Sequence, residues 1–216
     1  MVYRKRYPTK RRPRRAKKMM RRKRRVPRLI NQNSLTIWQS NLNDLIISNS
    51  SVGPVTGAIG FQLSFVQNYQ TYVNIYDYYK INQVKMIFTP VTSDHRDYTT
   101  VTPNLAQNLP MFYTCIDRDD GSTPSDAAEI RGYGNSRTHN PTRKFTITMK
   151  PSVLTEIFSS NVATAYKITP APKLDLGYSF VQHFGLKYAM EACSPTGAYT
   201  YRVETLYNIT FSGRRK

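Results

Sequence analysis

The sequence predicts an all-β protein: a single eight-stranded antiparallel jelly roll, which is a two-sheet β-sandwich, with long loops and a disordered basic N-terminal arm. Three observations lead to this fold class. Apolar and polar residues alternate along much of the chain, helical periodicity is scarce, and clusters of turn-forming residues separate the alternating segments. No internal repeat recurs at a fixed spacing, which argues against a solenoid or a propeller.

The predicted arm covers residues 1–30. Between Arg4 and Arg28, sixteen of twenty-five positions are Lys or Arg, and the first acidic residue of the chain is Asp44. Such a block repels itself and buries nothing, so we expect it to stay disordered until a polyanion neutralises it. Nucleic acid is the natural counter-polymer. We therefore expect nucleic acid to bind at the basic side chains of the arm: Arg4, Lys5, Arg6, Lys10, Arg11, Arg12, Arg14, Arg15, Lys17, Lys18, Arg21, Arg22, Lys23, Arg24, Arg25 and Arg28.

Two basic clusters within the arm are also typical of nuclear-import signals. One consists of Lys10, Arg11, Arg12, Arg14 and Arg15, and the other of Arg21, Arg22, Lys23, Arg24 and Arg25. Trp38 follows shortly after the arm and is a candidate for base stacking. A buried tryptophan in the core of the body is the alternative interpretation of the same residue.

The body, residues 31–216, is long enough for one substantial hydrophobic core. Its alternation has period two: Val84, Met86 and Phe88 lie on one side of a strand, and Phe145, Ile147 and Met149 lie on one side of another. We expect these side chains to face the core. Strands are predicted near residues 35–41, 58–67, 81–90, 111–117, 143–150, 164–169, 180–190 and 198–211.

Short helices are expected at residues 69–77 and 125–130, and at 151–158 after Pro151. The loops at 92–110 and 118–142 are unusually long. Loops of this length are usually functional, and here we expect them to make contacts between subunits.

The sequence shows no catalytic site, so we do not expect an enzyme. We expect neither a cofactor nor a metal ion. His95, His139 and His183 are far apart, and none has a Cys or His at ligand spacing. The acidic segment at residues 117–121 has its glycine one place too early for a calcium loop, and Ala128 stands where the loop needs Glu, so we predict a polar turn. No run of eighteen apolar residues is present, so no transmembrane segment is predicted.

The arm and the eight-stranded body together resemble the capsid proteins of circoviruses and cycloviruses. Residues 78–90 (YYKINQVKMIFTP) are similar to a family strand that follows a Tyr-Tyr pair, and residues 111–120 (MFYTCIDRDD) to a family strand that ends in acidic residues. Residues 143–151 and the long C-terminal strand fall in the family's order. One departure concerns the arm, whose aromatic residues are only Tyr3 and Tyr7, whereas family arms often carry Trp.

The resemblance implies a protein that self-assembles into the smallest (T=1) icosahedral shell, of sixty copies, and packages circular single-stranded DNA through inward-facing arms. It also implies a place in the virion, passage through the host nucleus with host import receptors as partners, and non-specific binding of other RNA or DNA. The resemblance does not identify the host cell-surface attachment factor. The alternative is a non-viral nucleic-acid-binding protein, of ribosomal or chromatin type, with a basic tail. Such proteins usually spread cations over the body, whereas residues 29–216 hold sixteen basic and thirteen acidic side chains.

Overall fold

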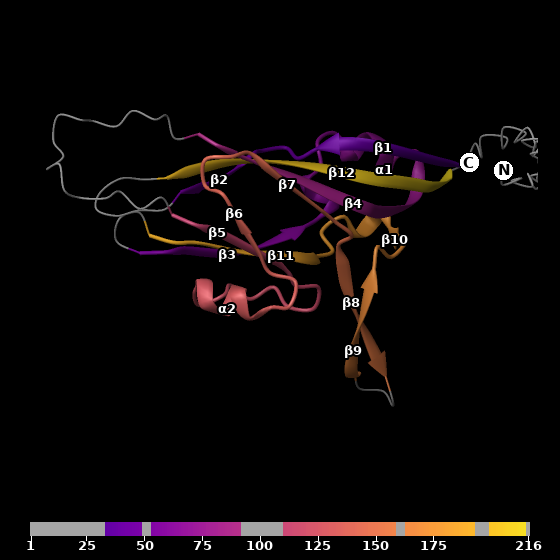
Figure 1. Ribbon diagram of the computed structural model, residues 1–216. Coiled ribbons are helices and arrows are strands. Elements are labelled where there is room, and N and C mark those ends of the chain that lie inside the picture. Colours follow the sequence, from indigo (N-terminus) through magenta and orange to yellow (C-terminus); the bar gives the residue numbers. More distant parts are fainter. Residues whose placement is uncertain (1–32, 49–52, 92–109, 159–162, 193–198, 215–216) are drawn as a thin grey trace, which may run out of the picture. The chain divides into compact units, whose positions relative to one another are not determined.

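The computed structural model describes residues 33–48, 53–91, 110–158, 163–192 and 199–214. They all belong to one compact unit, residues 32–216, whose main strands form two antiparallel sheets that face each other (Figure 1). Within these described ranges, no helix is long and apolar enough to cross a membrane.

The first sheet has the order β1-β12-β4-β7. It is built from β1 (Ser34–Ser40), β12 (Thr200–Arg214), β4 (Tyr76–Pro90) and β7 (Phe145–Met149). The short strand β2 (Leu45–Ser48) also pairs with β12, and β10 (Leu174–Asp175) also pairs with β4. The two long strands β12 and β4 therefore form the centre of this sheet.

The second sheet has the order β6-β5-β11-β3. It is built from β6 (Arg137–His139), β5 (Phe112–Ile116), β11 (His183–Met190) and β3 (Val55–Phe61). A hairpin of β8 (Ser152–Phe158) and β9 (Ala163–Pro170) joins this sheet through one residue pair, Phe184 with Ser152. The eight main strands thus divide four and four between the sheets, which confirms the predicted jelly roll.

The structure corrects the prediction at several elements. The predicted strand at 164–169 is β9, part of the extra hairpin, and the strand that completes the sandwich is the three-residue β6. The helix predicted at 151–158 is wrong: this segment is β8, where β-branched residues alternate and pair with β9. The strand predicted at 58–67 ends at Phe61, because a 3-10 turn follows at Leu63–Phe65. The strands β2 and β10 were not predicted.

The two remaining predicted helices are present but short. They are α1 (Tyr69–Val73) and α2 (Ala127–Gly132). Asp126 caps α2 by accepting a hydrogen bond from the Glu129 amide at 2.8 Å, and Glu129 in turn accepts one from the Ser125 amide. A second 3-10 turn, Leu176–Tyr178, follows β10.

The core lies between the two sheets and is rich in aromatic rings. The ring of Phe88 is fully buried and stacks on that of Phe145 at a centroid distance of 4.6 Å. Phe112, from the opposite sheet, packs against both rings. The predicted core residues Val84, Met86, Ile147 and Met149 are buried, and Phe145 is partly buried.

A second, smaller apolar cluster lies beneath α2. The helix packs its buried Ile130 against Tyr113, Cys115 and Ala189 of strands β5 and β11, and so covers the outer face of the second sheet. The outer face of the first sheet is different, because it leaves Trp38, Lys80, Lys144 and Lys150 exposed. That face is where the candidate site lies.

Candidate nucleic-acid interface

The sixteen basic residues predicted to bind nucleic acid, and the two import clusters among them, all precede residue 33. They lie outside the described residues. The structure therefore bears on nucleic-acid binding through Trp38 and the surface around it.

Trp38 lies on the outer face of β1 and is 51% exposed. Its neighbour Ile37 points the other way and packs against the core. The alternative of a buried core tryptophan is therefore wrong. The alternation along β1 indicates an exposed position for Trp38, because this residue shares its side of the strand with the polar residues Thr36 and Ser40.

Beside Trp38, polar side chains are linked across three strands. Thr36 of β1 and Thr210 of β12 share a hydrogen bond of 2.7 Å. The Asn82 amide of β4 donates to Asn208 Oδ1 at 2.9 Å and to Thr210 Oγ1 at 2.7 Å. Strand register places Trp38 opposite Asn208 and Lys80 opposite Thr210, so the indole and the first lysine flank this polar network.

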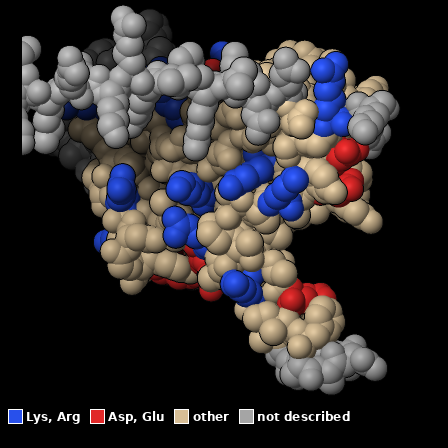
Figure 2. Space-filling model, turned by 90° about the vertical axis from the view of Figure 1, so that its right-hand side faces the viewer, with Lys and Arg blue, Asp and Glu red and all other residues tan. Residues whose placement is uncertain are grey.

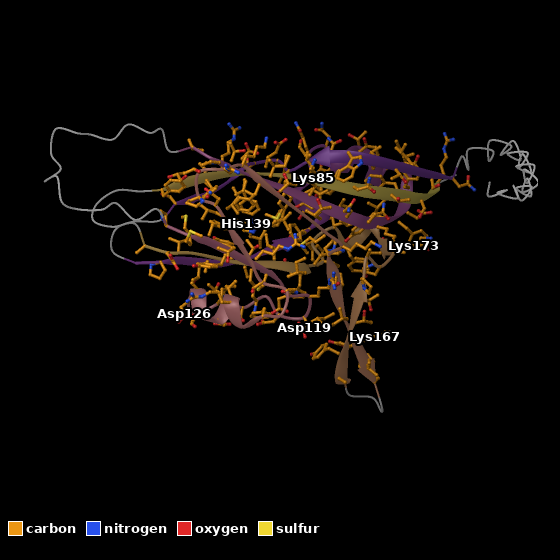
Figure 3. All side chains as sticks on the ribbon, in the orientation of Figure 1. Lys85, Asp119, Asp126, His139, Lys167 and Lys173 are labelled. Atoms are coloured by element: carbon orange, nitrogen blue, oxygen red, sulfur yellow. The ribbon has the colours of Figure 1, made fainter. Side chains whose placement is uncertain are left out.

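Four lysines carry positive charge on the same face. Lys80 and Lys85 lie on the outer side of β4, and Lys144 and Lys150 flank β7 on the side opposite its buried residues. Lys85 pairs in register with Thr148 of β7 and lies on the far side of the sheet from His139 (Figure 3). Among the described residues these lysines form no ion pair, because the cations of the salt bridges are Lys187 and Arg202.

The other end of the first sheet is neutralised. Arg202 Nε lies 2.5 Å from Asp44 Oδ2, and Glu204 lies two residues further along β12. Together with Ser40, Asn41 and Thr89, these three residues line a shallow hollow. Free cationic charge on this face is therefore concentrated around β4 and β7. Figure 2, which views the right-hand end of Figure 1, shows a row of Lys and Arg side chains across the middle of that end, above the projecting hairpin.

The acidic segment predicted as a polar turn holds an internal cation instead of a metal. Lys187 of β11 is 1% exposed, and its Nζ lies 3.0 Å from Asp117 Oδ2 and 2.6 Å from Asp120 Oδ2. The Tyr133 hydroxyl also donates to Asp117 Oδ2, at 3.0 Å. This cluster could not be predicted from the sequence, because Lys187 lies 67 residues from Asp120.

This cluster stays ionised. Burial alone would raise the pKa of Asp117, but hydrogen bonds with Asp119, Lys187 and Tyr133 bring it below its usual value. Burial alone would also lower the pKa of Lys187, yet its bonds to Asp120 and Asp117 raise it. The cluster thus ties the segment before α2 to β11. Asp119 and Asp126 lie beside α2, on the side of the second sheet and away from Lys85 (Figure 3).

The histidines have structural positions. His139 Nε2 shares a 2.8 Å hydrogen bond with Thr114 Oγ1, and its ring stacks on Phe145 at 3.9 Å. Burial lowers the pKa of His139 to about 4, with a further contribution from Arg137. His183 is fully buried and its Nδ1 bonds to the Val181 carbonyl at 2.9 Å. His95 lies outside the described residues.

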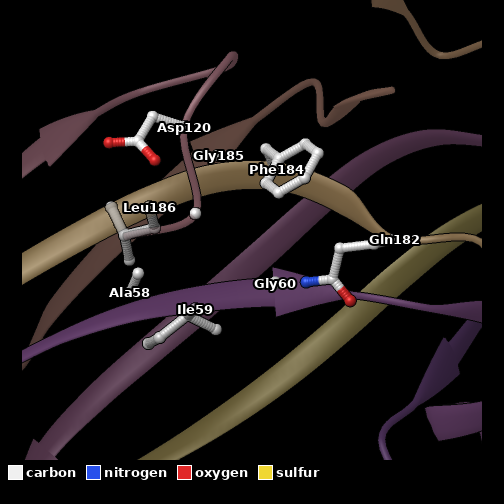
Figure 4. A pocket seen from close by; sticks show the side chains of 9 residues that line it. Ala58, Ile59, Gly60, Asp120, Gln182, Phe184, Gly185 and Leu186 are labelled. Atoms are coloured by element: carbon white, nitrogen blue, oxygen red, sulfur yellow. The ribbon is translucent and has the colours of Figure 1, made fainter. Parts of the chain in front are cut away.

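The pocket beside the acidic segment is too small for a small-molecule ligand. Figure 4 shows a pocket between β3, β11 and the segment at Asp120, lined in part by Gly60 and Gln182. Its volume is about 40 Å³, far below the roughly 300 Å³ at which small-molecule sites begin. Within the described ranges, no group of three His, Cys, Asp or Glu side chains is placed to hold a metal ion.

Comparison with known proteins decides the family. The family model described as circovirus capsid protein matches residues 4–215. The chain belongs to the circovirus capsid protein family. It is therefore a viral capsid protein and a component of the virion, as the resemblance predicted, and it is a structural protein and not an enzyme.

Solved structures support the fold. The BFDV capsid protein crystallised as a 60-mer is 15% identical, with a TM-score of 0.63, covering 85% of this chain and 96% of that one. Its decameric form gives 16% identity, a TM-score of 0.54 and coverage of 85% and 99%. A structure from Cucumber Leaf Spot Virus gives 12% identity, a TM-score of 0.53 and coverage of 86% and 52%. No curated protein sequence matches the chain.

Proposed function

We propose that this capsid protein assembles into a T=1 icosahedral shell of sixty copies and packages circular single-stranded DNA through residues 1–30, while residues 31–216 form the shell. The observation that carries the proposal is the separation of charge. Sixteen cations without a single anion lie between Arg4 and Arg28, ahead of a nearly neutral body. Family membership and the 60-mer of the BFDV capsid protein support the shell.

The charge of the arms is of the right size for a small genome. Sixty arms with sixteen cations each carry about 960 positive charges, which neutralise on the order of a thousand phosphates. The arm would bind phosphates without reading bases, because phosphate contacts carry no sequence information.

The outer face of the first sheet would be the second contact with DNA. Its four lysines are free to pair with phosphates, and Trp38 offers an exposed ring for base stacking. By contrast, carboxylates gather by the second sheet, at Asp117, Asp119, Asp120, Asp126 and Glu129. A polyanion inside the shell favours an orientation with the first sheet facing inward.

The basic clusters of the arm would also direct the protein to the host nucleus by binding host import receptors. This role is compatible with DNA binding, because the import receptor and the genome would meet the arm at different times. The same charge would bind other RNA or DNA non-specifically.

Deletion of residues 1–28 tests the arm. The residues of the core cluster all lie between Ile47 and Phe211, so the truncated chain should keep its fold and melting temperature. We expect it to lose most affinity for single-stranded DNA and to stop accumulating in nuclei. A truncated chain that bound DNA as tightly as the full chain, and with the same steep salt dependence, would show that the arm is not the main site.

A further inference from the structure

The hairpin of β8 and β9 lies outside the two-sheet sandwich and has no part in the proposed DNA binding. It projects away from both sheets (Figures 1 and 2). Its root is held by the pairing of Ser152 with Phe184 and by a 3.0 Å hydrogen bond from the Ala171 amide to the Pro151 carbonyl. Ser152 is buried there, whereas every residue from Thr155 to Phe158 is exposed.

The exposed part of this hairpin is unusually apolar. Tyr166 is 64% exposed, Phe158 is 57% exposed, and Ile157 and Ile168 are also exposed. A two-stranded hairpin on its own is only marginally stable in water and needs a further layer on one face. Exposed apolar strands are also an aggregation hazard that proteins normally cover. Because no described residue covers these side chains, a further surface is expected to pack against the hairpin.

One face of the hairpin is suited to such a contact. Leu154 pairs with Ile168 and Glu156 pairs with Tyr166, which places three apolar side chains and one carboxylate on the same side. The opposite face is more polar, with a 3.0 Å hydrogen bond between Thr155 and Thr169. Glu156 forms no ion pair with any described residue, so its charge is free for a partner.

We propose that the hairpin face of Leu154, Glu156, Tyr166 and Ile168 packs against a second copy of this chain and joins neighbouring subunits. The inference rests on the proposed assembly. Its support is that the chain belongs to the circovirus capsid protein family, and that the BFDV capsid protein forms a 60-mer.

Each copy also carries an apolar surface that is suited to receive the hairpin. Leu42, Phe65 and Phe180 are all exposed. Backbone hydrogen bonds from Leu42 to Phe65 at 2.8 Å and from Ser64 to Ser179 at 3.0 Å hold their three segments together. Because hairpin and patch are different surfaces, the contact would be heterologous, which is the type of contact that closes rings and builds shells.

The test replaces two exposed side chains of this face in the full-length chain. Tyr166→Ser with Ile168→Ser should raise the protein concentration needed for half-maximal particle formation by about tenfold or more, because buried aromatic anchors dominate interface energies. The melting temperature of the unassembled protein should not change, since both side chains are exposed in the single chain. Light scattering across a concentration series measures the first quantity.

Two control variants sharpen the result. Ile46→Ser removes an aliphatic side chain from β2 that is more exposed (68%) than Ile168 (42%), and Tyr166→Phe keeps the ring. Both should form particles like the unmodified chain. A double variant that assembles normally, or an Ile46→Ser chain that is impaired as strongly, would overturn the proposal.

Hydrogen exchange on the unmodified chain gives an answer that does not depend on any variant. The amides of residues 154–158 and 165–168 should exchange more slowly in particles than in the unassembled protein. Equal rates in both states would overturn the role of the hairpin while leaving assembly intact. If the unmodified chain formed no particles under any condition, the proposed assembly itself would fall.

Discussion

The face that carries Trp38 makes a quantitative prediction about salt. The perturbation is the replacement of Lys80, Lys85, Lys144 and Lys150 by Gln in a chain that lacks residues 1–28, so that the arm does not mask the contribution of the body. Each phosphate contact on a single strand contributes about 0.7 to the slope of log affinity against log salt. Four contacts therefore contribute up to roughly 3 to that slope.

The expected effect is large enough to measure. When the salt concentration rises from 0.1 to 0.4 M, the affinity of the truncated chain for a single-stranded oligonucleotide should fall. This fall should be up to about 50-fold larger than the fall measured for the four-lysine variant. Fluorescence anisotropy across a salt series gives both slopes. The matched control removes four cations elsewhere, by replacing Arg118, Arg131, Arg137 and Lys167 with Gln.

Trp38 separates base stacking from charge on the same face. Trp38→Ala should cost about 1–3 kcal/mol of binding without changing the salt slope, and Trp38→Phe should restore most of it. Two results would contradict a phosphate-binding role for this face: a four-lysine variant that keeps the parental slope, or a control set that lowers the slope equally. The first result would mean that these lysines do not contact phosphates, and the second that binding follows the net charge of the body and not this face.

Three further predictions concern the fold. Lys187→Met should cost about 3–5 kcal/mol in urea unfolding, because it leaves the buried Asp117 carboxylate without its cation; a loss under about 1 kcal/mol would show that the pair is not buried in solution. Phe88→Ala should cost about 3–5 kcal/mol and prevent assembly, and a particle-forming variant with an unchanged melting temperature would mean that the core is misplaced. The melting temperature should fall as the pH drops from about 6.5 to about 4, because the unfolded chain binds a proton on His139 before the folded chain does. His139→Gln should weaken this pH dependence, and a chain whose dependence is unchanged would contradict the assignment.

Assembly should also depend on charge. Sixty arms facing one cavity would repel each other unless counter-charged, so the nuclease-treated full chain should form particles poorly at low salt and better at high salt. Addition of single-stranded DNA should restore assembly at low salt. Scattering across a salt series checks this, and empty shells that form equally well at every salt would show that the arms do not govern assembly.

The jelly roll was predictable because most of its strands have a side that must be apolar. Val84, Met86 and Phe88 alternate with polar residues, and this alternation is what burial against a second sheet requires. β6 was missed because Arg137–His139 is too short to show any period. A short segment that follows Pro151 is compatible with a helix as well as with a strand, and only pairing with β9 decides the conformation of residues 152–158.

The candidate site was predictable only in part. The charge of the arm follows directly from composition. By contrast, Lys80 and Lys150 are seventy residues apart in sequence and come to the same face only because β4 pairs with β7. The pairing of Lys187 with Asp117 likewise depends on the neighbouring positions of β5 and β11 in the sheet. Of the long loops expected to join subunits, residues 92–109 lie outside the described residues, and 118–142 contains α2 and β6.

The mass of the purified particle with bound single-stranded DNA tests the central claim most directly. Sixty chains of 24.9 kDa amount to about 1.5 MDa of protein, and one layer of domain-sized subunits forms a particle of roughly 20 nm. Multi-angle light scattering with ultraviolet absorbance gives the protein and DNA masses separately, and negative-stain imaging gives the diameter. We expect one uniform species with protein of that mass, whose DNA is lost when residues 1–28 are deleted. A protein that stays monomeric with DNA, or particles whose DNA content does not depend on the arm, would contradict it.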